Sequence, residues 1–428
     1  MAGEWHRKSL REAGVTLIDC DHRTPPAAVS GYPYVAIPQL KEGRLSLGDV
    51  RLISSEHFIE WTRKAKPQHH DVVLSRRCNP GETAYVPAGI ECALGQNLVL
   101  LRADGRKLFP PFLRWLVRGT DWWEQVGTFI HDGAVFESLR CADIPNFKMP
   151  LPPLPEQKAI AGVLGALDDK IELNRRMNAT LEAMARALFQ SWFEDFDPVR
   201  AKLDGRTPVG MDPATAAFFP ASFHDSPLGH IPTGWGAIPL YDTAQWVNGA
   251  AFKNEDFCSS GEGLPVIKIG ELKGGISDQT KWCQRDAGAD KIIDTGDLVY
   301  SWSGSPDTSL EAFLWSGGRG LLNQHIFKVI SPTAAEKRFV YYLLQYLRPV
   351  LVEKARNKQT NGLGHVTIAD MKRLLVCMPS KDVLAAFDLN IAPIFDKAFT
   401  NTLESRTLAT LRDTLLPKLL SGELKTSN

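Results

Sequence analysis

The residue types in this sequence that could do catalytic chemistry do not fall into a complete catalytic pattern. Glu271 and Lys273, with Asp256 upstream, form a loose version of the carboxylate and lysine set of metal-dependent nucleases. The similar earlier segment Gln39-Leu-Lys41 has no carboxylate at the matching position. The sequence also lacks a phosphate-binding G-x-x-x-x-G-K-[ST] loop, an H-E-x-x-H zinc pair and a G-x-S-x-G nucleophile turn. We therefore expect a binding or scaffolding protein without a catalytic site, metal site or cofactor of its own, and keep a nuclease site at Glu271 and Lys273 as an alternative.

Basic and amide side chains gather in two stretches and are candidates for reading DNA. Arg, Asn and Gln recognise purine edges in the major groove, while Lys and Arg also neutralise phosphates. Charge clusters also form ordinary solvated surface, so composition leaves DNA binding open. The candidates, four in each half of the chain, are Arg76, Arg77, Asn79, Gln96, Asn323, Gln324, His325 and Lys358.

The two stretches belong to an internal repeat. Matching segments recur in the same order, each second segment lying 226 to 232 positions after the first. The pairs include Tyr34–Leu40 with Val266–Leu272, Asp71–Ser75 with Asp297–Ser301, and Ala142–Ile144 with Ala369–Met371. Since such a repeat is too long for a solenoid unit, it indicates tandem duplication of a whole domain with an attached element.

The attached element has the pattern of a long helix. Pro155 and Glu156 are favourable first residues, and apolar side chains recur at helical spacing from there to Glu194. Nearly forty residues at ~1.5 Å rise make a rod of about 60 Å. The heptad frame has Ile160, Leu167, Asn174, Leu181 and Leu188 at a, and Val163, Lys170, Met177 and Met184 at d. In the second copy, from Asp382 to Leu420, we expect Pro393 to interrupt the helix.

Polar residues recur at seam positions of both predicted helices. Lys397 and Asn401 each lie 227 positions after their counterparts, Lys170 and Asn174. A polar seam residue lowers stability but fixes register and partner. We therefore expect the two helices to pair with each other, with these four residues setting the register. The alternative is that each helix packs on its own domain and its polar residues face solvent.

The rest of the chain divides into domains and a connector. Residues 1–153 and 232–380 combine short β-rich runs with helices in irregular order, which indicates an α+β fold rather than a doubly wound sheet. Residues 154–195 and 381–428 hold the long helices. Closely spaced prolines predict that residues 196–231 form an extended connector.

Composition limits the compartment and the partners. The 428 residues carry 49 basic and 49 acidic side chains, and this zero net charge argues against a self-sufficient DNA binder. Seven scattered cysteines without a C-x-x-C pair fit a reducing cytoplasm better than disulfides or zinc. With no run of 18 apolar residues and no secretory signal, we expect a cytoplasmic protein that does not engage a membrane.

Three segments resemble the conserved regions of Type I restriction-modification specificity subunits. Leu151–Ala161, leading into the helix that ends at Ser191–Arg200, resembles their central conserved region. Gly229–Trp235 resembles the entry to their second target-recognition domain, and Leu415–Leu424 resembles their C-terminal conserved region. Together with the duplication, the similarity spans nearly the whole chain. The first domain keeps only Trp5 of the opening motif, and the second helix begins with Ser380-Lys-Asp instead of Pro-Glu-Gln.

The resemblance implies a non-catalytic subunit with two target-recognition domains, at 1–153 and 232–380. A pseudo-two-fold internal repeat would relate them, and the long helices would separate them as an antiparallel coiled coil. Each domain would read one half of a bipartite site in double-stranded DNA. Two modification subunits would supply S-adenosylmethionine and N6-adenine methylation, and up to two restriction or motor subunits would supply ATP, Mg²⁺ and cleavage. The competing hypothesis is a duplicated-domain coiled-coil scaffold that binds proteins without DNA.

Overall fold

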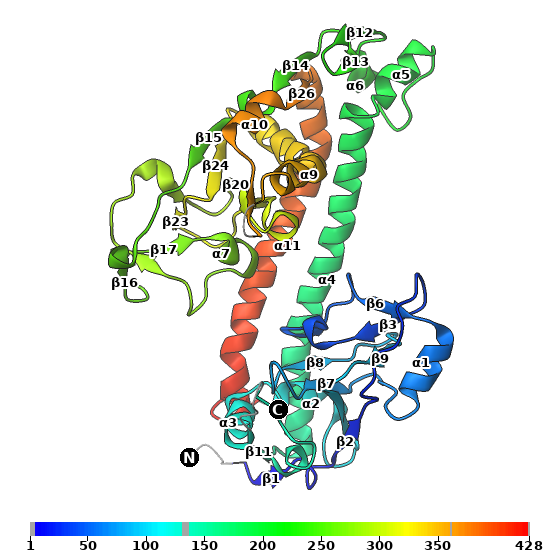
Figure 1. The fold of residues 1–428 in the computed structure, drawn as a ribbon, viewed down its shortest axis with the longest axis vertical. Helices are drawn as coiled ribbons and strands as arrows, with labels where there is room; N and C mark the ends of the chain where they lie inside the picture. Colours follow the sequence, from blue (N-terminus) through cyan, green and yellow to red (C-terminus); the bar gives the residue numbers. More distant parts are fainter. Residues whose placement is uncertain (1–4, 131–136, 360–361, 427–428) are drawn as a thin grey trace. The chain divides into compact units, whose positions relative to one another are not determined.

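The protein folds into two compact units. A computed structural model describes residues 5–130, 137–359 and 362–426. One unit comprises Met1–Glu172 and Arg406–Asn428, and the other comprises Leu173–Ser405. Each unit combines one mixed α and β domain with stretches of the two longest helices (Figure 1). The predicted α+β class is confirmed.

The first unit is built around a six-stranded sheet with both faces covered. Leu98 and Leu100 pack into one hydrophobic core, while Val99 and Leu101 pack into another on the opposite face. The strand order is β2 (Val15–Asp19), β10 (Leu98–Ala103), β7 (Val72–Ser75), β8 (Thr83–Tyr85), β5 (Gly43–Leu45) and β4 (Leu40–Lys41). The remaining elements are the sheet β6 (Arg51–Ile53), β3 (Tyr32–Val35), β9 (Ala93–Leu94), the pair β1 (Arg7–Ser9) and β11 (Lys148–Pro150), and helices α1 (Ser55–Thr62), α2 (Pro110–Leu116) and α3 (Thr120–Phe129).

The second unit repeats this plan with one longer helix, α9 (Ala334–Arg356). Its four-stranded sheet has the order β15 (Gln245–Asn248), β24 (Ile326–Ile330), β20 (Leu298–Ser301) and β22 (Glu311–Leu314). Its five-stranded sheet has the order β16 (Phe257–Cys258), β18 (Trp282–Cys283), β17 (Leu264–Ile267), β23 (Gly320–Leu322) and β19 (Ile292–Ile293). The pairs are β14 (Gly236–Pro239) with β26 (Leu375–Met378) and β21 (Ser303–Gly304) with β25 (Gly364–His365). The helices are α7 (Ile269–Gly274), α8 (Pro306–Ser309), α9 (Ala334–Arg356) and α10 (Ile368–Arg373).

Strand registers show that the duplication extends to individual residue pairs. In the antiparallel pairs, Leu98 faces Ser75 in the first unit, and Ile326 faces Ser301 in the second. In the parallel pairs, Tyr34 faces Ala93 and Val266 faces Leu321. Each second-unit residue lies 226 to 232 positions after its first-unit counterpart. Because a slip of one residue would exchange the two faces of a strand, the shared register gives equivalent residues equivalent positions.

Helices α4 (Leu154–Phe193) and α11 (Lys381–Leu420) are each 40 residues long and run through both units. In the second unit, Asn174 contacts Ser405 and Asn178 contacts Ala398, so the pair is antiparallel there. In the first unit, Asp168 of α4 contacts Arg412 of α11. The predicted pairing of the two long helices is confirmed.

Two details of the predicted helices were wrong. Pro393 does not interrupt α11, which continues from Lys381 to Leu420. Ile391 and Phe395 on either side of it are buried, so packing of the neighbouring residues holds the helix together despite the hydrogen bond that proline cannot make. The heptad frame placed Val163 and Met184 in the seam, but their side chains are 42% and 53% exposed. Burial on α4 follows a broader helical stripe, since the helix packs on a β-rich domain as well as on α11.

The extended connector predicted for residues 196–231 was also wrong. This segment contains α5 (Asp197–Leu203), α6 (Pro213–Ala217) and most of the hairpin β12 (Phe223–Ser226) and β13 (Gly229–Pro232). Pro198 and Pro213 lie in the first turns of these helices, where proline is favourable. Val199 and Phe219 are buried in the core of the second unit. The prolines therefore begin short packed elements instead of keeping the chain extended.

Candidate nucleic-acid interface

In the first unit, one edge of the main sheet brings together residues from three strands. The antiparallel order of β2, β10 and β7 places the end of β2, the start of β10 and the end of β7 at this edge, which we call edge 1. Arg76 directly follows β7, and its N–H donates to the Asn97 carbonyl at 2.9 Å. Asn97 has φ of 67°, a left-handed conformation that asparagine tolerates, and it closes the turn that presents Gln96. Edge 1 thus joins Arg76 and Gln96.

The first-unit candidates differ in accessibility. Arg77, Asn79 and Gln96 are exposed, while Arg76 is half-buried. The Arg76 guanidinium lies 3.4 Å from the Leu139 carbonyl through Nη1. The exposed side chains, above all the cation of Arg77, are therefore free to meet an anionic ligand at this loop.

The second unit has the equivalent edge, which we call edge 2. It joins the end of β15, the end of β20 and the turn before β24. The turn carries Asn323, Gln324 and His325, of which Gln324 and His325 are exposed. Gln324 Nε2 lies 3.3 Å from His325 Nε2. Three of the four second-unit candidates therefore lie together on one turn.

Lys358, the fourth candidate, is held by another residue. Its ammonium lies 2.6 Å from both carboxylate oxygens of Asp370. Burial alone would raise the pKa of the Asp370 carboxyl, but hydrogen bonds from Lys358 and Thr367 outweigh it and lower the pKa to about 2. The lysine charge is thus neutralised at the start of α10, which leaves Lys358 poorly suited to a phosphate contact.

Edge 2 also contains two residues that sequence reasoning missed. Trp302 follows β20 and Asn248 ends β15, and the indole N–H of Trp302 donates to Asn248 Oδ1 at 3.1 Å. A signal for Trp302 existed, because its distance from Arg76 along the chain falls within the range of repeat offsets. It was not singled out because tryptophan carries no charge.

The residues predicted to set the helix register occupy different environments. Asn174 and Asn401 are fully buried between α4 and α11. Asn174 Nδ2 lies 2.8 Å from a Glu404 carboxylate oxygen. Lys170 is half-buried and Lys397 is exposed. The buried polar layer in the second unit is therefore made by the asparagines and not by the lysines.

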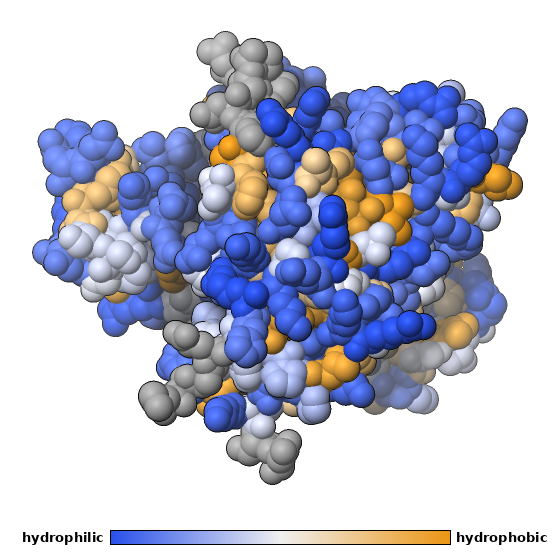
Figure 2. Space-filling view, turned by 90° about the horizontal axis from the view of Figure 1, so that it is seen from below, coloured by the Kyte–Doolittle hydropathy of each residue, from blue (hydrophilic) through white to orange (hydrophobic). Residues whose placement is uncertain are grey.

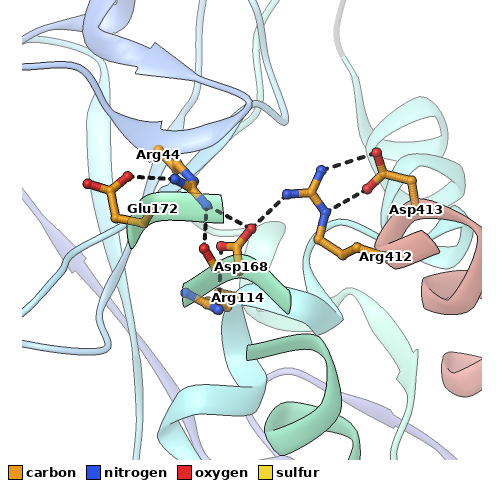
Figure 3. A network of polar contacts seen from close by, with 6 residues as sticks. All are labelled: Arg44, Arg114, Asp168, Glu172, Arg412 and Asp413. Atoms are coloured by element: carbon orange, nitrogen blue, oxygen red, sulfur yellow. Dashed lines mark hydrogen bonds and ion pairs between the residues drawn. The ribbon is translucent and has the colours of Figure 1, made fainter. Parts of the chain in front are cut away.

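In the first unit, a buried ionic cluster ties the β-rich domain to both long helices (Figure 3). The Asp168 carboxylate of α4 accepts from Arg412 of α11 at 2.7 Å and pairs with Arg44 of β5 at 2.8 Å. Arg114 of α2 lies 3.5 Å from its other oxygen. Arg44 also donates to Glu172 at 2.8 Å. One aspartate therefore connects β5, α2, α4 and α11.

Charge keeps Asp168 ionised in this cluster. Burial would raise the pKa of its carboxyl, but the Arg44 and Arg114 charges and hydrogen bonds from Arg44 and Arg412 outweigh burial and lower the pKa. The cluster is not duplicated, because the repeat equivalents of Asp168 and Arg412 are Phe395 and Ala185. There, Phe395 packs edge-on against Tyr341 with ring centroids 5.3 Å apart.

Two groups that could suggest metal chemistry have other roles. Glu271 accepts from the Lys268 N–H at 3.0 Å as the first turn of α7 forms, and Asp256 accepts from the Lys253 N–H at 2.7 Å. Asp19, Cys20 and His22 bring their ligand atoms within 4.8 Å of one another. The Cys20 thiol donates to the Gly95 carbonyl at 3.1 Å, and His22 Nε2 lies 3.1 Å from Asp19 Oδ2. In both groups the candidate ligand atoms therefore have partners within the protein.

The surface in Figure 2 is mainly hydrophilic, with hydrophobic residues in small separate groups. Across the described ranges, no helix has the length and apolar character needed to cross a membrane.

Comparison with known proteins finds similarity along most of the chain. A family model for the Type I restriction modification DNA specificity domain matches residues 22–183. The chain is 25% identical to the Type I restriction enzyme HindI specificity subunit of Haemophilus influenzae, over 82% of this chain and 86% of the relative. It is also 25% identical to the MjaIX specificity subunit of Methanocaldococcus jannaschii, over 69% of this chain and 65% of the relative.

The fold has a counterpart among solved structures. The crystal structure of a Type I restriction-modification system S subunit from M. genitalium superposes with a TM-score of 0.56 at 14% identity, covering 97% of this chain and 96% of the other. The family model matches the first repeat and the relatives extend the similarity along most of the chain, so this chain is similar to the specificity subunits of Type I restriction-modification systems, and the solved structure shows that the fold is shared.

Proposed function

We propose that this chain is the DNA-specificity subunit of its restriction-modification system, and that each unit reads one half of a bipartite site in double-stranded DNA. The observation that carries the proposal is the equivalence of edges 1 and 2. The same strand register places Arg76 and Gln96 on edge 1 and Gln324 and His325 on edge 2. Both edges offer amide or basic groups that suit base edges in the major groove.

The helix pair is the element that would fix the spacing of the half-sites. The buried Asn174 and Asn401 support this role, because sliding one helix along the other would separate their hydrogen-bonding groups in an apolar seam. The spacing would then be a property of the helices, while base preference would belong to the two edges.

Exposed apolar side chains on the long helices support the docking of two modification subunits. In the first unit these are Val163 of α4 and Leu411 of α11, and in the second unit Met184 of α4 and Leu389 of α11. Met184 and Leu411 are related by the same repeat offset as Asn174 and Asn401. The equivalent of Val163 is Asn390, and the neighbouring Leu389 points about 100° away around the helix, so this position is not repeated. Each unit therefore offers one exposed apolar side chain at a repeated position, Leu411 in the first unit and Met184 in the second, as two identical partners require.

We assign the chemistry to those partners. In this proposal the modification subunits bind S-adenosylmethionine and methylate adenine, restriction or motor subunits use ATP and Mg²⁺, and the assembled complex acts on chromosomal DNA in the cytoplasm. The zero net charge of the chain then implies weak DNA affinity for the isolated subunit.

The test is to co-express the chain with the modification subunit of its system and to map methylated adenines across the host genome. A split motif with a fixed gap is the expected result. Absence of any methylated motif from a folded, purified complex would reject DNA specificity and favour the protein-binding scaffold. A gel-shift series at increasing salt adds a second readout, since phosphate contacts make log affinity fall linearly with log salt.

A further inference from the structure

We propose that Asn248 is a specificity-determining residue of the second half-site, and that Trp302 positions it. The inference rests on the proposed function and concerns edge 2 alone. It names the base chemistry read there: a thymine in the major groove, recognised through its O4 acceptor and its methyl group.

Strand register places Trp302 where the first unit has Arg76. Trp302 follows β20 as Arg76 follows β7, and the serines before them face equivalent strand residues. The backbone bond is also repeated, because Arg76 N–H donates to Asn97 and Trp302 N–H donates to His325 at 3.3 Å. One position of the duplicated fold thus carries a cation in one unit and an indole in the other.

The indole fixes the orientation of the Asn248 amide. An indole N–H only donates, so the Asn248 atom 3.1 Å away must be the carbonyl oxygen. The amide NH₂ group is therefore directed away from Trp302, on an exposed side chain at the end of β15. Asn248 presents two N–H donors and needs an acceptor on its ligand.

Packing in turn fixes the indole. Trp302 stacks on Phe327 with ring centroids 5.7 Å apart and meets His325 edge-on at 5.8 Å. Its carbonyl accepts from the Val366 N–H at 2.9 Å. The half-buried ring still offers part of its apolar surface beside the Asn248 donors.

A donor next to an apolar surface matches one base in the major groove. Thymine presents the O4 acceptor beside its C5 methyl group, whereas cytosine presents a donor and no methyl group. Guanine offers acceptors and adenine offers the N7 acceptor beside the N6 donor, but neither has a methyl group to meet the apolar surface. Edge 2 therefore favours thymine, while the arginine at the equivalent place on edge 1 favours guanine.

The test measures base preference at each position of the second half-site, using the complex with the modification subunit on DNA randomised in that half. Asn248→Ala should lower the preference for thymine at one position about tenfold, as expected for loss of a direct base contact. Asn248→Asp keeps an acceptor for Trp302 but replaces the outward donors with an acceptor, so preference there should move to a base with a donor, adenine or cytosine.

Trp302→Phe keeps an aromatic ring but loses the N–H that orients Asn248, so it should weaken the base preference at the same position of the half-site. Combining Trp302→Phe with Asn248→Ala should weaken the base preference at that position no further than Asn248→Ala alone, because both changes act through the Asn248 amide. Trp246→Phe is the matched control: this buried tryptophan of β15 donates to the Tyr241 carbonyl at 2.8 Å, and its loss should lower stability without changing preference.

The outcomes separate this inference from the proposed function. If the unaltered complex methylates a split motif but Asn248→Ala and Asn248→Asp keep its preference at every position, the assignment of Asn248 is overturned and the proposed function stands. If the unaltered complex recognises no motif, both are overturned. A preference change at the first half-site would also overturn the assignment.

Discussion

Asn174 and Asn401, equivalent residues of the two repeats, make symmetric hydrogen bonds across the helix pair. Asn401 Nδ2 donates to Asn178 Oδ1 at 2.9 Å, and Asn174 Nδ2 donates to Ser405 Oγ at 3.3 Å. Asn178 and Ser405 are themselves equivalent at the same repeat offset. Asn174 thus bonds to the residue four positions after Asn401, and Asn401 bonds to the residue four positions after Asn174. A local two-fold relationship between the two helices requires such a symmetric pattern. Only one relative position of α4 and α11 provides both bonds.

Replacing both asparagines by leucine is expected to stabilise the helix pair and loosen its register. A single Asn174→Leu should cost about 1–3 kcal/mol, because Asn401 and its neighbours would keep buried polar groups without this partner. The double variant removes the polar requirement from both helices and should be more stable than the unaltered protein. Urea unfolding measures the stabilities, and methylated sites in the complex measure the gap between half-sites.

The control for that pair is Asn390→Leu on α11. Asn390 is exposed and donates to the Ala386 carbonyl of its own helix, a bond that does not depend on the register with α4. The variant should leave the gap between half-sites unchanged. An unaltered gap in the double leucine variant would show that the asparagines do not set register.

Removing the Asp168 carboxylate is expected to be far more damaging than removing Glu172. Asp168→Ala leaves Arg412 and Arg114, whose side chains are 10% and 12% exposed, without a central partner, and should cost about 3–5 kcal/mol. Glu172→Ala removes a carboxylate that is 34% exposed and should cost less than about 1 kcal/mol. Urea unfolding of both variants tests the difference, and equal losses would contradict a central role for Asp168.

The Lys358–Asp370 pair predicts a pH dependence of stability. The folded-state pKa of Asp370, about 2, lies below its ordinary 3.8, so the ionised pair stabilises the fold above about pH 4. This stability is lost as the pH falls from 3.8 toward 2. Because the lysine is 41% exposed, we expect ~1 kcal/mol. The unfolding free energy of Asp370→Asn should fall less across this range than that of the unaltered protein, and parallel curves would contradict the assignment.

The repeated exposed apolar side chains, Met184 and Leu411, predict how many modification subunits bind. Met184→Glu and Leu411→Glu should each remove one of two subunits, and the double variant should remove both, because a carboxylate cannot be buried in an apolar contact at low cost. Light scattering of the purified complexes gives the mass. Leu203→Glu, at the end of α5 and 57% exposed, is the control and should change nothing. Full occupancy in the double variant would reject this docking surface.

The features of the fold that could be predicted from the sequence are those that leave a repeat or a helical period in it. The duplication, the α+β class and the helix pair follow from segment offsets and apolar spacing, and Asn174 and Asn401 stood out as polar residues in an apolar seam. The helices and hairpin of residues 196–231 were not predicted, because proline is frequent both in extended chain and in the first turn of a helix. Only the burial of Val199 and Phe219 distinguishes these two outcomes.

The candidate interface was predicted by residue type, and this explains why the structure brings some of its residues together but pairs Lys358 with another side chain. Lys358 was chosen for its charge, but Asp370, twelve residues away in the chain, neutralises it across the fold. Asn248 and Trp302 are 54 residues apart and meet only because β15 and β20 both flank β24. Local sequence does not determine the order of strands in a sheet, so pairs of residues brought together by that order can be identified only in the folded chain.

Arg77 and Lys358, two basic candidates, are expected to behave differently toward DNA. Arg77 is exposed on edge 1, so Arg77→Ala should weaken binding of the complex to its target and reduce the slope of log affinity against log salt by about one, if it meets a phosphate. Lys358→Ala should leave this slope unchanged, because Asp370 already neutralises the charge, and should lower stability instead. Lys64→Ala, an exposed lysine outside both edges, controls for net charge. Equal slopes for all three variants would remove Arg77 from the interface, since a charge that neutralises a phosphate must alter counterion release.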